Sequence, residues 1–409
     1  MFFNKDNHSQ NPSQEFSDDI HKDEIKKCLL PAKFMLESLC IWPGSDSIIL
    51  QTIAWILFWN LVVLQIFHAG YVLVNIRDIG KAASAWITVT TIFQALLKLH
   101  IILTRKKVLN QILTKVWKNF WPLCAVTKDN VKLRLRRYTM VPIMLLASSL
   151  ICAHLCNIIV TGQPFIIQHG LILKSSFPFD WNKMYIYEVL YVWQYSLEWY
   201  AILAIEAFDI LFVVLVAICS VQFVILQEAS RSILSRDSKM QRKIIFDDRA
   251  WKMTDNEMLW ECFKLHQLLI DICDAMEATL NRAILIQFAV CTSANCCAFL
   301  IMKVDYQQFI KMLFAAVAYL FQLFYYCYVG QQLSDESEKL ADAIYECDWY
   351  LEYNRDFRKG MVLMIQRGQR KICLTAVGLF ELDFSSFVKI LRLSFSFYTL
   401  LDSLVMEKE

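Results

Sequence analysis

The sequence predicts an all-α integral membrane protein with seven transmembrane helices, an N-terminus in the cytoplasm and a C-terminus outside the cell. Its 409 residues are 57% hydrophobic and 20% charged, whereas soluble domains are about 45–50% apolar and about 25% charged. Seven segments are long and apolar enough to cross the roughly 30 Å hydrocarbon core of a bilayer. The formal net charge of +2 excludes a nucleic-acid binder that acts through a basic surface.

The apolar runs predict the transmembrane helices in chain order. The second run is the weakest, because Lys98 and His100 interrupt it. The fourth would measure about 65 Å as a helix, roughly twice what the bilayer needs, so we expect it to project into water at one end. The predicted spans are residues 48–76, 82–104, 138–161, 185–227, 283–303, 307–330 and 373–405.

The orientation follows from Lys and Arg, which accumulate on the cytoplasmic side of a membrane. Of the 41 Lys and Arg residues, 30 lie in the N-terminal segment and in the connections 105–137, 228–275 and 331–371. Seven lie between the first two spans, in the stretches 163–184 and 303–311, and after the last span. The predicted orientation is the opposite of that of a G-protein-coupled receptor, so a metabotropic seven-helix receptor is disfavoured.

Two of the charged connections contain amphipathic helices, at residues 256–275 and 333–352. Together with the overlong fourth span they predict a packed helical bundle beneath the membrane, and the alternative is that they lie in the lipid interface. The 14 Cys residues form no C-x-x-C pair and no zinc-like spacing. The sequence has no nucleotide-binding loop or nucleophile motif. We therefore expect no metal, no cofactor and no enzymatic activity.

The last predicted span carries one polar stripe, which we call the seam. Its members are spaced alternately four and three residues apart, so they fall within about 80° of the helix circumference. Such a seam faces either water in a pore or the polar groups of neighbouring helices. One helix cannot enclose a pore, so a pore requires several subunits in a ring. The seam comprises Ser385, Lys389, Arg392, Ser396, Thr399 and Ser403.

The C-terminal third resembles the insect odorant receptors. The segment YCYVGQQLSDESEKLADAIYECDWY (326–350) is similar to the family's Tyr-Cys-x-x-Gly pattern with a closing Trp-Tyr. The segment FVKILRLSFSFYTLL (387–401) is similar to its terminal signature. The sequence lacks the Thr-Tyr…Gln-Phe ending of the related gustatory receptors and the terminus of the shared co-receptor. It therefore resembles a tuning subunit of the family.

The resemblance implies an odorant-sensing subunit of a ligand-gated, non-selective cation channel in the plasma membrane, expected in the dendrite of an olfactory neuron. Co-receptor subunits would complete a heterotetramer, the ligand would be a neutral volatile odorant, and membrane lipid would surround the spans. A homomeric channel like a gustatory receptor is the alternative. The implied domains are a cytoplasmic segment at 1–47, the first six spans with an odorant pocket at 48–330, an anchor at 331–371 and the pore helix at 372–409.

The resemblance also implies roles for individual residues. A hydrophobic constriction of Leu400 and Leu404 would close the pore, with Thr399 and Ser396 just below it; the alternative is that these leucines pack against the fifth or sixth span. Tyr345, Trp349 and Tyr350 would belong to the anchor. Candidate odorant contacts in the outer half are Trp86, Thr90, Phe93, Ser149, Cys152, Tyr191, Tyr195, Trp199, Ser293, Cys296 and Phe314.

Two acidic residues stand within the fourth span. Glu206 and Asp209 are one turn apart on the same face, and Lys98 and Arg282 are the nearest intramembrane cations by depth. A buried ion pair would fix helix packing at considerable desolvation cost. The alternative is a relay for protons or ions, and the sequence does not decide which cation pairs with which acid.

Overall fold

The computed structural model describes residues 23–122, 125–126, 128–166, 170–183, 185–235, 238–246 and 252–406. These residues fold into long helices with one short hairpin. The helices and strands are α1 (Asp23–Ser38), α2 (Ile48–Val74), α3 (Ile79–Thr104), α4 (Lys106–Asn119), α5 (Asp129–Ile166), α6 (Ile186–Arg231), α7 (Ser238–Phe246), α8 (Asp255–Val304), the 3-10 turn η5 (Tyr306–Gln308), α9 (Phe309–Tyr345), the 3-10 turn η6 (Trp349–Leu351), α10 (Arg355–Gly368), β1 (Thr375–Ala376), β2 (Phe380–Glu381) and α11 (Phe384–Met406).

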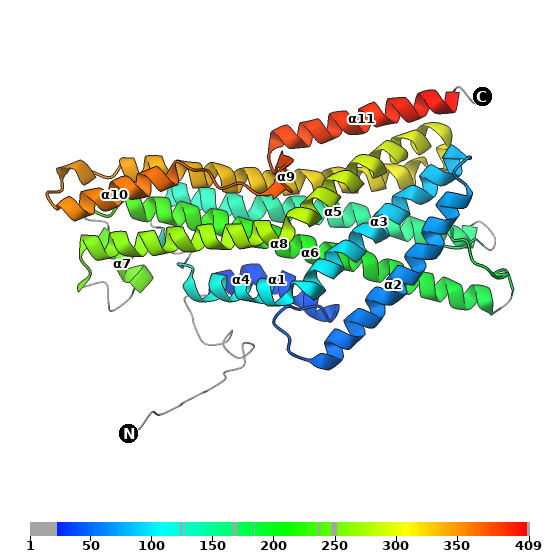
Figure 1. Ribbon diagram of the computed structural model, residues 1–409, viewed down its shortest axis with the longest axis horizontal. Coiled ribbons are helices and arrows are strands. Elements are labelled where there is room, and N and C mark those ends of the chain that lie inside the picture. The colour runs from blue at the N-terminus through cyan, green and yellow to red at the C-terminus, as the bar shows by residue number, and fades with distance from the viewer. Residues whose placement is uncertain are drawn as a thin grey trace, which may run out of the picture.

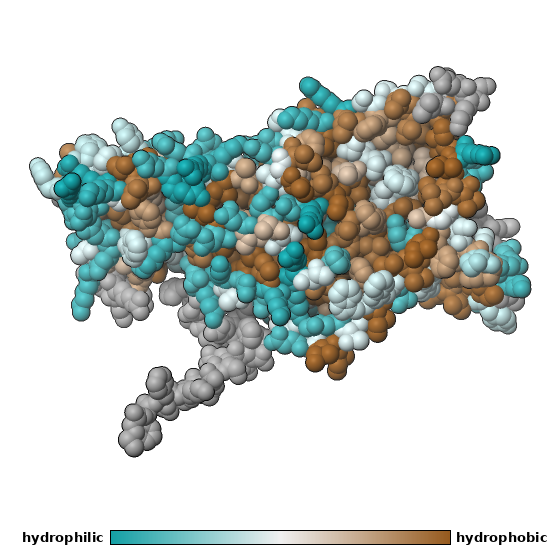
Figure 2. Space-filling view, viewed as in Figure 1, coloured by the Kyte–Doolittle hydropathy of each residue, from teal (hydrophilic) through white to brown (hydrophobic). Residues whose placement is uncertain are grey.

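The molecule is elongated, and α6, α8 and α9 run along most of its length (Figure 1). One end, which we call the stem, contains α7, α10 and the adjoining ends of those three long helices. The other end, the membrane half, contains α2, α3 and α11 beside their opposite ends. Figure 2 shows hydrophobic side chains over the membrane half and mainly hydrophilic ones over the stem. That division is typical of a bundle with one half in lipid and the other in water.

Six helices in the described parts of the chain are long and apolar enough to cross a membrane: α2, α3, α5, α6, α8 and α9. They overlap the first six predicted spans, although the spans 48–76, 185–227 and 307–330 extend one or two residues beyond α2, α6 and α9. The overlong fourth span is α6, with 46 residues. The seventh helix, α11, has 23 residues, among them Lys389, Arg392 and Asp402. Its place as a membrane span stays a prediction.

The predicted amphipathic helix 256–275 is the stem end of α8, whereas the predicted helix 333–352 is wrong at its end, because α9 stops at Tyr345 and the chain then turns into η6. A capping box starts α8: the hydroxyl of Thr254 accepts the Glu257 N–H, and the Glu257 carboxylate accepts the Thr254 N–H. No Gly or Pro follows before Val304, so the helix continues unbroken for 50 residues. In the stem, Cys262 of α8 and Leu340 of α9 are fully buried. The apolar faces therefore pack inside the bundle.

A buried carboxylate on α9 joins three helices of the stem. Glu336 is fully buried and accepts a hydrogen bond from Tyr138 of α5 at 2.6 Å, together with an ion pair from Arg134 of the same helix. Its backbone carbonyl accepts a hydrogen bond from Gln227 Nε2 of α6 at 2.8 Å. A buried charge needs such partners to offset its desolvation.

The last predicted span, 373–405, is wrong at its start. Residues Thr375–Ala376 and Phe380–Glu381 form an antiparallel hairpin, whose loop places Val377 and Gly378 at φ 53° and 70°. Glycine adopts such angles without a steric penalty. Helix α11 begins only at Phe384, where the Asp383 carboxylate accepts the Ser386 N–H at 2.6 Å. An aspartate that caps the first turn stops the helix from extending backwards.

Candidate functional site

An internal pocket lies in the membrane half, between α3, α5, α6 and α9. The volume that the centre of a water molecule can reach is about 120 Å³. Twelve of the 26 lining residues are aliphatic, and the others are polar, charged or aromatic. The aliphatic side chains are Ile87, Ile92, Leu150, Ala153, Val160, Leu173, Ala201, Ile202, Ile205, Met312, Ala315 and Ala318.

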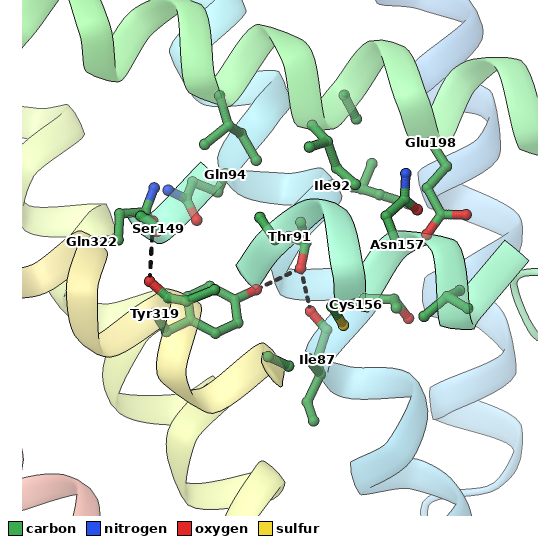
Figure 3. A pocket seen from close by; sticks show the side chains of 18 of the residues that line it. Ile87, Thr91, Ile92, Gln94, Ser149, Cys156, Asn157, Glu198, Tyr319 and Gln322 are labelled. Carbon is green, nitrogen blue, oxygen red and sulfur yellow. Dashed lines mark hydrogen bonds between the residues drawn. The ribbon is translucent and has the colours of Figure 1, made fainter. Parts of the chain in front are cut away.

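Hydrogen bonds at and beside this pocket hold the surrounding helices together, and Figure 3 shows the one between Thr91 and Tyr319. The Thr91 hydroxyl of α3 and the Tyr319 hydroxyl of α9 are 2.5 Å apart. The Ser149 hydroxyl of α5 donates to the carbonyl of Ala318 at 3.3 Å, and the Tyr191 hydroxyl of α6 donates to the carbonyl of Thr161 at 3.0 Å. These contacts fix α3 and α5 against α9, and α6 against α5.

A charged cluster closes one end of the pocket. The Asp209 carboxylate of α6 accepts hydrogen bonds from Lys98 Nζ at 2.5 Å and from Gln322 Nε2 at 2.6 Å. It also accepts the hydroxyls of Tyr325 at 2.8 Å and Tyr326 at 2.6 Å. Lys98 is 1% exposed and Asp209 is 2% exposed. The Asp209 carboxylate is therefore saturated with donors, as a buried structural charge requires.

The structure thus decides the pairing that the sequence left open. Lys98 pairs with Asp209, whereas Glu206 faces His154, whose Nε2 is 3.3 Å from the Glu206 carboxylate. Arg282 lies on the surface of α8. The fully bonded Asp209 favours helix packing over an ion relay. Lys98 also donates to Gln287 of α8 at 3.0 Å, so the cluster extends from the pocket to the helix that packs against α11.

The walls of the pocket carry charged side chains. Glu198, Glu206, Asp209 and Lys311 line them, together with amide side chains. Glu198, Lys311 and the amides were missed because a polar residue in an apolar helix can face either a cavity or another helix. Their only signal in the sequence is that each interrupts an apolar run.

The candidate odorant contacts divide into three groups. Ser149 lines the internal pocket. Trp86, Ser293 and Cys296 line a second, more open apolar pocket of about 740 Å³ between α3, α8 and α11. The remaining candidates line neither of these two pockets: Thr90, Phe93, Cys152, Tyr191, Tyr195, Trp199 and Phe314.

Three residues of that last group, Tyr191, Tyr195 and Trp199, form a row of aromatic side chains along α6. Tyr191 and Tyr195 stack with ring centroids 6.5 Å apart, and Tyr195 contacts Trp199 at 6.2 Å. Trp199 in turn stacks on His154 of α5 at 5.5 Å. The expected i, i+4, i+8 row therefore exists, and it packs α6 against α5 beside the pocket.

The seam of α11 faces away from the rest of the chain. All six seam residues are exposed, including Lys389, Arg392 and Thr399. The opposite face is buried against the bundle through Ile390, which is 3% exposed, and Ser394, which is 1% exposed. Among the described residues, the seam hydroxyls therefore have no hydrogen bond to a neighbouring helix: Thr399 and Ser403 bond to carbonyls one turn back in α11.

The gate and anchor candidates lie at the surface of the chain. Leu400 is 55% exposed and borders the second pocket, while the side chain of Leu404 lies outside what the structure describes. Tyr345 is 68% exposed and Tyr350 is 59% exposed, near the end of the stem. Trp349 is partly buried and packs against the core. The two tyrosines are thus free to contact another subunit.

Comparison with known proteins identifies the family. A profile described as 7tm Odorant receptor matches residues 78–395. Odorant receptor 43b of Drosophila melanogaster is 21% identical over 251 residues, which are 60% of this chain and 59% of that receptor. Odorant receptor 98a of the same species is 28% identical over 155 residues, 37% of this chain and 38% of that receptor. The chain thus spans about two fifths to three fifths of these curated relatives.

Solved structures share the fold at low identity. The insect olfactory receptor OR5 from Machilis hrabei matches with a TM-score of 0.79 and 13% identity over 94% of this chain and 99% of that one. The same receptor in complex with eugenol matches with a TM-score of 0.77 and 12% identity, over 94% and 100% of the two chains. The profile covers more than three quarters of the sequence. This chain therefore belongs to the 7tm odorant receptor family, as a multi-pass membrane receptor and not an enzyme.

Proposed function

We propose that this chain is the odorant-sensing subunit of a heteromeric, ligand-gated, non-selective cation channel in the plasma membrane. A volatile bound in the internal pocket would open a hydrophobic gate on α11. The observation that carries the proposal is the exposed seam of α11, combined with an internal pocket in the same half of the molecule. The first provides a surface for a pore and the second a site for a small ligand.

The pore argument rests on the cost of exposing polar groups to lipid. Hydroxyl and charged side chains in a membrane face a bundle interior or water, because hydrocarbon offers them no partner. The seam residues Lys389 and Arg392 do not face the interior of this chain. They therefore face water or other subunits, and a ring of subunits provides both. Leu400, exposed beside the seam, is the residue we assign to the constriction, with Leu404 one turn further.

The stem would be the cytoplasmic anchor through which subunits assemble. Exposed aromatic residues such as Tyr345 and Tyr350 are typical of buried contacts between subunits. Replacing Tyr345 and Trp349 together with Ala should reduce co-purification with co-receptor subunits. The control is Tyr353→Ala, at a residue 94% exposed a few positions further on. If the double variant is expressed normally and co-purifies as well as the wild type, the contact between subunits does not include this face of the stem.

The experiment that tests the proposal is a recording of odorant-evoked current, with and without co-receptor subunits, over a panel of volatiles. We expect little current from this chain alone and a clear current with the co-receptor. A robust odorant-gated current from the chain alone would instead support a homomeric channel of the gustatory type. An N-terminal tag that is accessible on intact cells would support the inverted topology of a metabotropic receptor, and would contradict the channel orientation.

A further inference from the structure

One side chain of the internal pocket has no hydrogen-bond partner for either of its polar atoms. Asn157 of α5 is 2% exposed, and neither its Oδ1 nor its Nδ2 bonds to any residue that the structure describes. Glu198 of α6 is 7% exposed, and its Oε2 likewise has no partner among those residues. Both side chains line the internal pocket. Figure 3 draws them side by side, at the end of the pocket away from Gln94 and Gln322.

Such groups are costly in a bundle interior. An amide or carboxylate that loses water without gaining a hydrogen bond destabilises the fold. The packing at this level does not depend on them, because the Tyr191–Thr161 hydrogen bond and the stack of His154 on Trp199 already join α5 to α6. The unpaired atoms are therefore available to a molecule in the pocket.

The donors and acceptors specify what that molecule must offer. Asn157 provides one donor group and one acceptor, and Glu198 provides a second acceptor. A hydroxyl group meets both requirements, because it can accept from Asn157 Nδ2 while it donates to Glu198 Oε2 or Asn157 Oδ1. An ether oxygen or a ketone can only accept, and an alkane can do neither. Lys311 lines the same pocket, so the pocket already contains a cationic side chain and a cationic ligand is not required.

We propose that the pocket selects volatiles with a hydroxyl group on an apolar skeleton, that is, alcohols or phenols. The hydroxyl would lie between Asn157 and Glu198, and the skeleton would extend along the aliphatic wall that includes Ile87, Ile92 and Ile205. This inference rests on the proposed function, since it names the ligand class for the same pocket. It makes Asn157 the residue that determines specificity between an alcohol and its isomeric ether.

The test compares isomers that differ only in the hydroxyl. Current is recorded from the chain co-expressed with a co-receptor, over dose series of hexanol with methyl pentyl ether and of cresol with anisole. The wild-type channel should respond to each alcohol at about tenfold lower concentration than to its ether, because one or two hydrogen bonds distinguish them. In Asn157→Leu, which keeps the approximate volume, that ratio should fall to about one. The loss should come from weaker responses to the alcohols.

The matched control is Asn295→Leu on α8. Asn295 is 1% exposed and its Oδ1 also has no partner among the described residues, but it lines neither the internal nor the second pocket. This variant should keep the tenfold ratio. Glu198→Leu is a second variant at the polar end, which should lower the ratio in the same direction. Surface labelling of each variant separates a change in specificity from poor folding.

The outcomes separate this inference from the proposed function. A wild-type ratio near one, with clear currents to both isomers, would overturn the hydroxyl assignment while leaving the odorant-gated channel in place. That result is also expected if water alone satisfies Asn157. An equal weakening of alcohols and ethers in Asn157→Leu, at normal surface expression, would overturn it too. If no volatile evokes current from surface-expressed wild-type complexes, the proposed function fails, and this inference fails with it.

Discussion

The buried pair Lys98–Asp209 makes a quantitative prediction about stability. In Lys98→Met, the Asp209 carboxylate keeps its three neutral donors but loses the cation bonded to it, in a position that is 2% exposed. Breaking a buried pair in this way costs about 3–5 kcal/mol. Asp209→Asn should cost a similar amount, because it leaves the Lys98 ammonium 1% exposed and facing an amide.

The double variant Lys98→Met with Asp209→Asn should be more stable than either single variant. It removes both charges and leaves only imperfect hydrogen bonds among neutral groups, at a cost of about 1–3 kcal/mol. The double variant should therefore lose at least about 3 kcal/mol less stability than the sum of the losses of the two single variants. Such non-additivity indicates direct coupling between the two residues. The assay is the midpoint of thermal unfolding in detergent, followed by size exclusion of a fluorescently tagged chain.

The matched control is the exposed pair Lys81–Asp78, whose charged atoms lie 2.9 Å apart with side chains 61% and 47% exposed. Exposed pairs contribute about 0–1 kcal/mol, so Lys81→Met and Asp78→Asn should change the midpoint little and additively. If the double variant at Lys98 and Asp209 unfolds as readily as the sum of its single variants predicts, the pair does not stabilise the membrane half and the reasoning is refuted.

Three further predictions concern α11 and the hairpin before it. Leu400→Ser should raise the current without odorant, since a polar side chain in a hydrophobic constriction lowers the cost of wetting; an unchanged basal current at normal surface expression would contradict the gate. Ser396→Cys should react with a water-soluble thiol reagent faster than the control Ser394→Cys, because Ser396 is exposed and Ser394 is 1% exposed. Equal reaction rates would contradict the pore face. Gly330→Ala should lower the free energy of unfolding by roughly 1–3 kcal/mol, because a Cβ there meets the side chain and carbonyl of Leu382. Gly162→Ala, with open space around its Cβ, should be neutral or slightly stabilising, and the yields of monodisperse protein compare the two.

The sequence was sufficient for the features that depend on periodicity and length. The extent of α6 and the single polar face of α11 are local patterns, so they could be recognised without knowing any contact between helices. The hairpin at 375–381 could also have been found, because Gly378 and Asp383 are ordinary turn and cap signals. An apolar stretch before α11 masked them.

The pocket could not be predicted in the same way. A helical wheel shows that Asn157 and Glu198 interrupt apolar runs. It does not show whether their polar atoms have hydrogen-bond partners, because such partners can come from residues far away in the chain. The partner of Lys98 is likewise 111 residues away. Six of the eleven candidate odorant contacts are aromatic, yet those of α6 pack against α5, and only two of the 26 residues that line the pocket are aromatic.

The continuity of α9 imposes a constraint on length that composition does not reveal. Tyr319 faces the pocket and Glu336 faces the core of the stem on the same uninterrupted helix. One inserted residue between them would rotate one end against the other by about 100° and lengthen the rod by about 1.5 Å. Either the pocket or the stem would then present the wrong side chains. Relatives with this architecture can exchange many residue types along this segment, but they should tolerate almost no insertion or deletion within it.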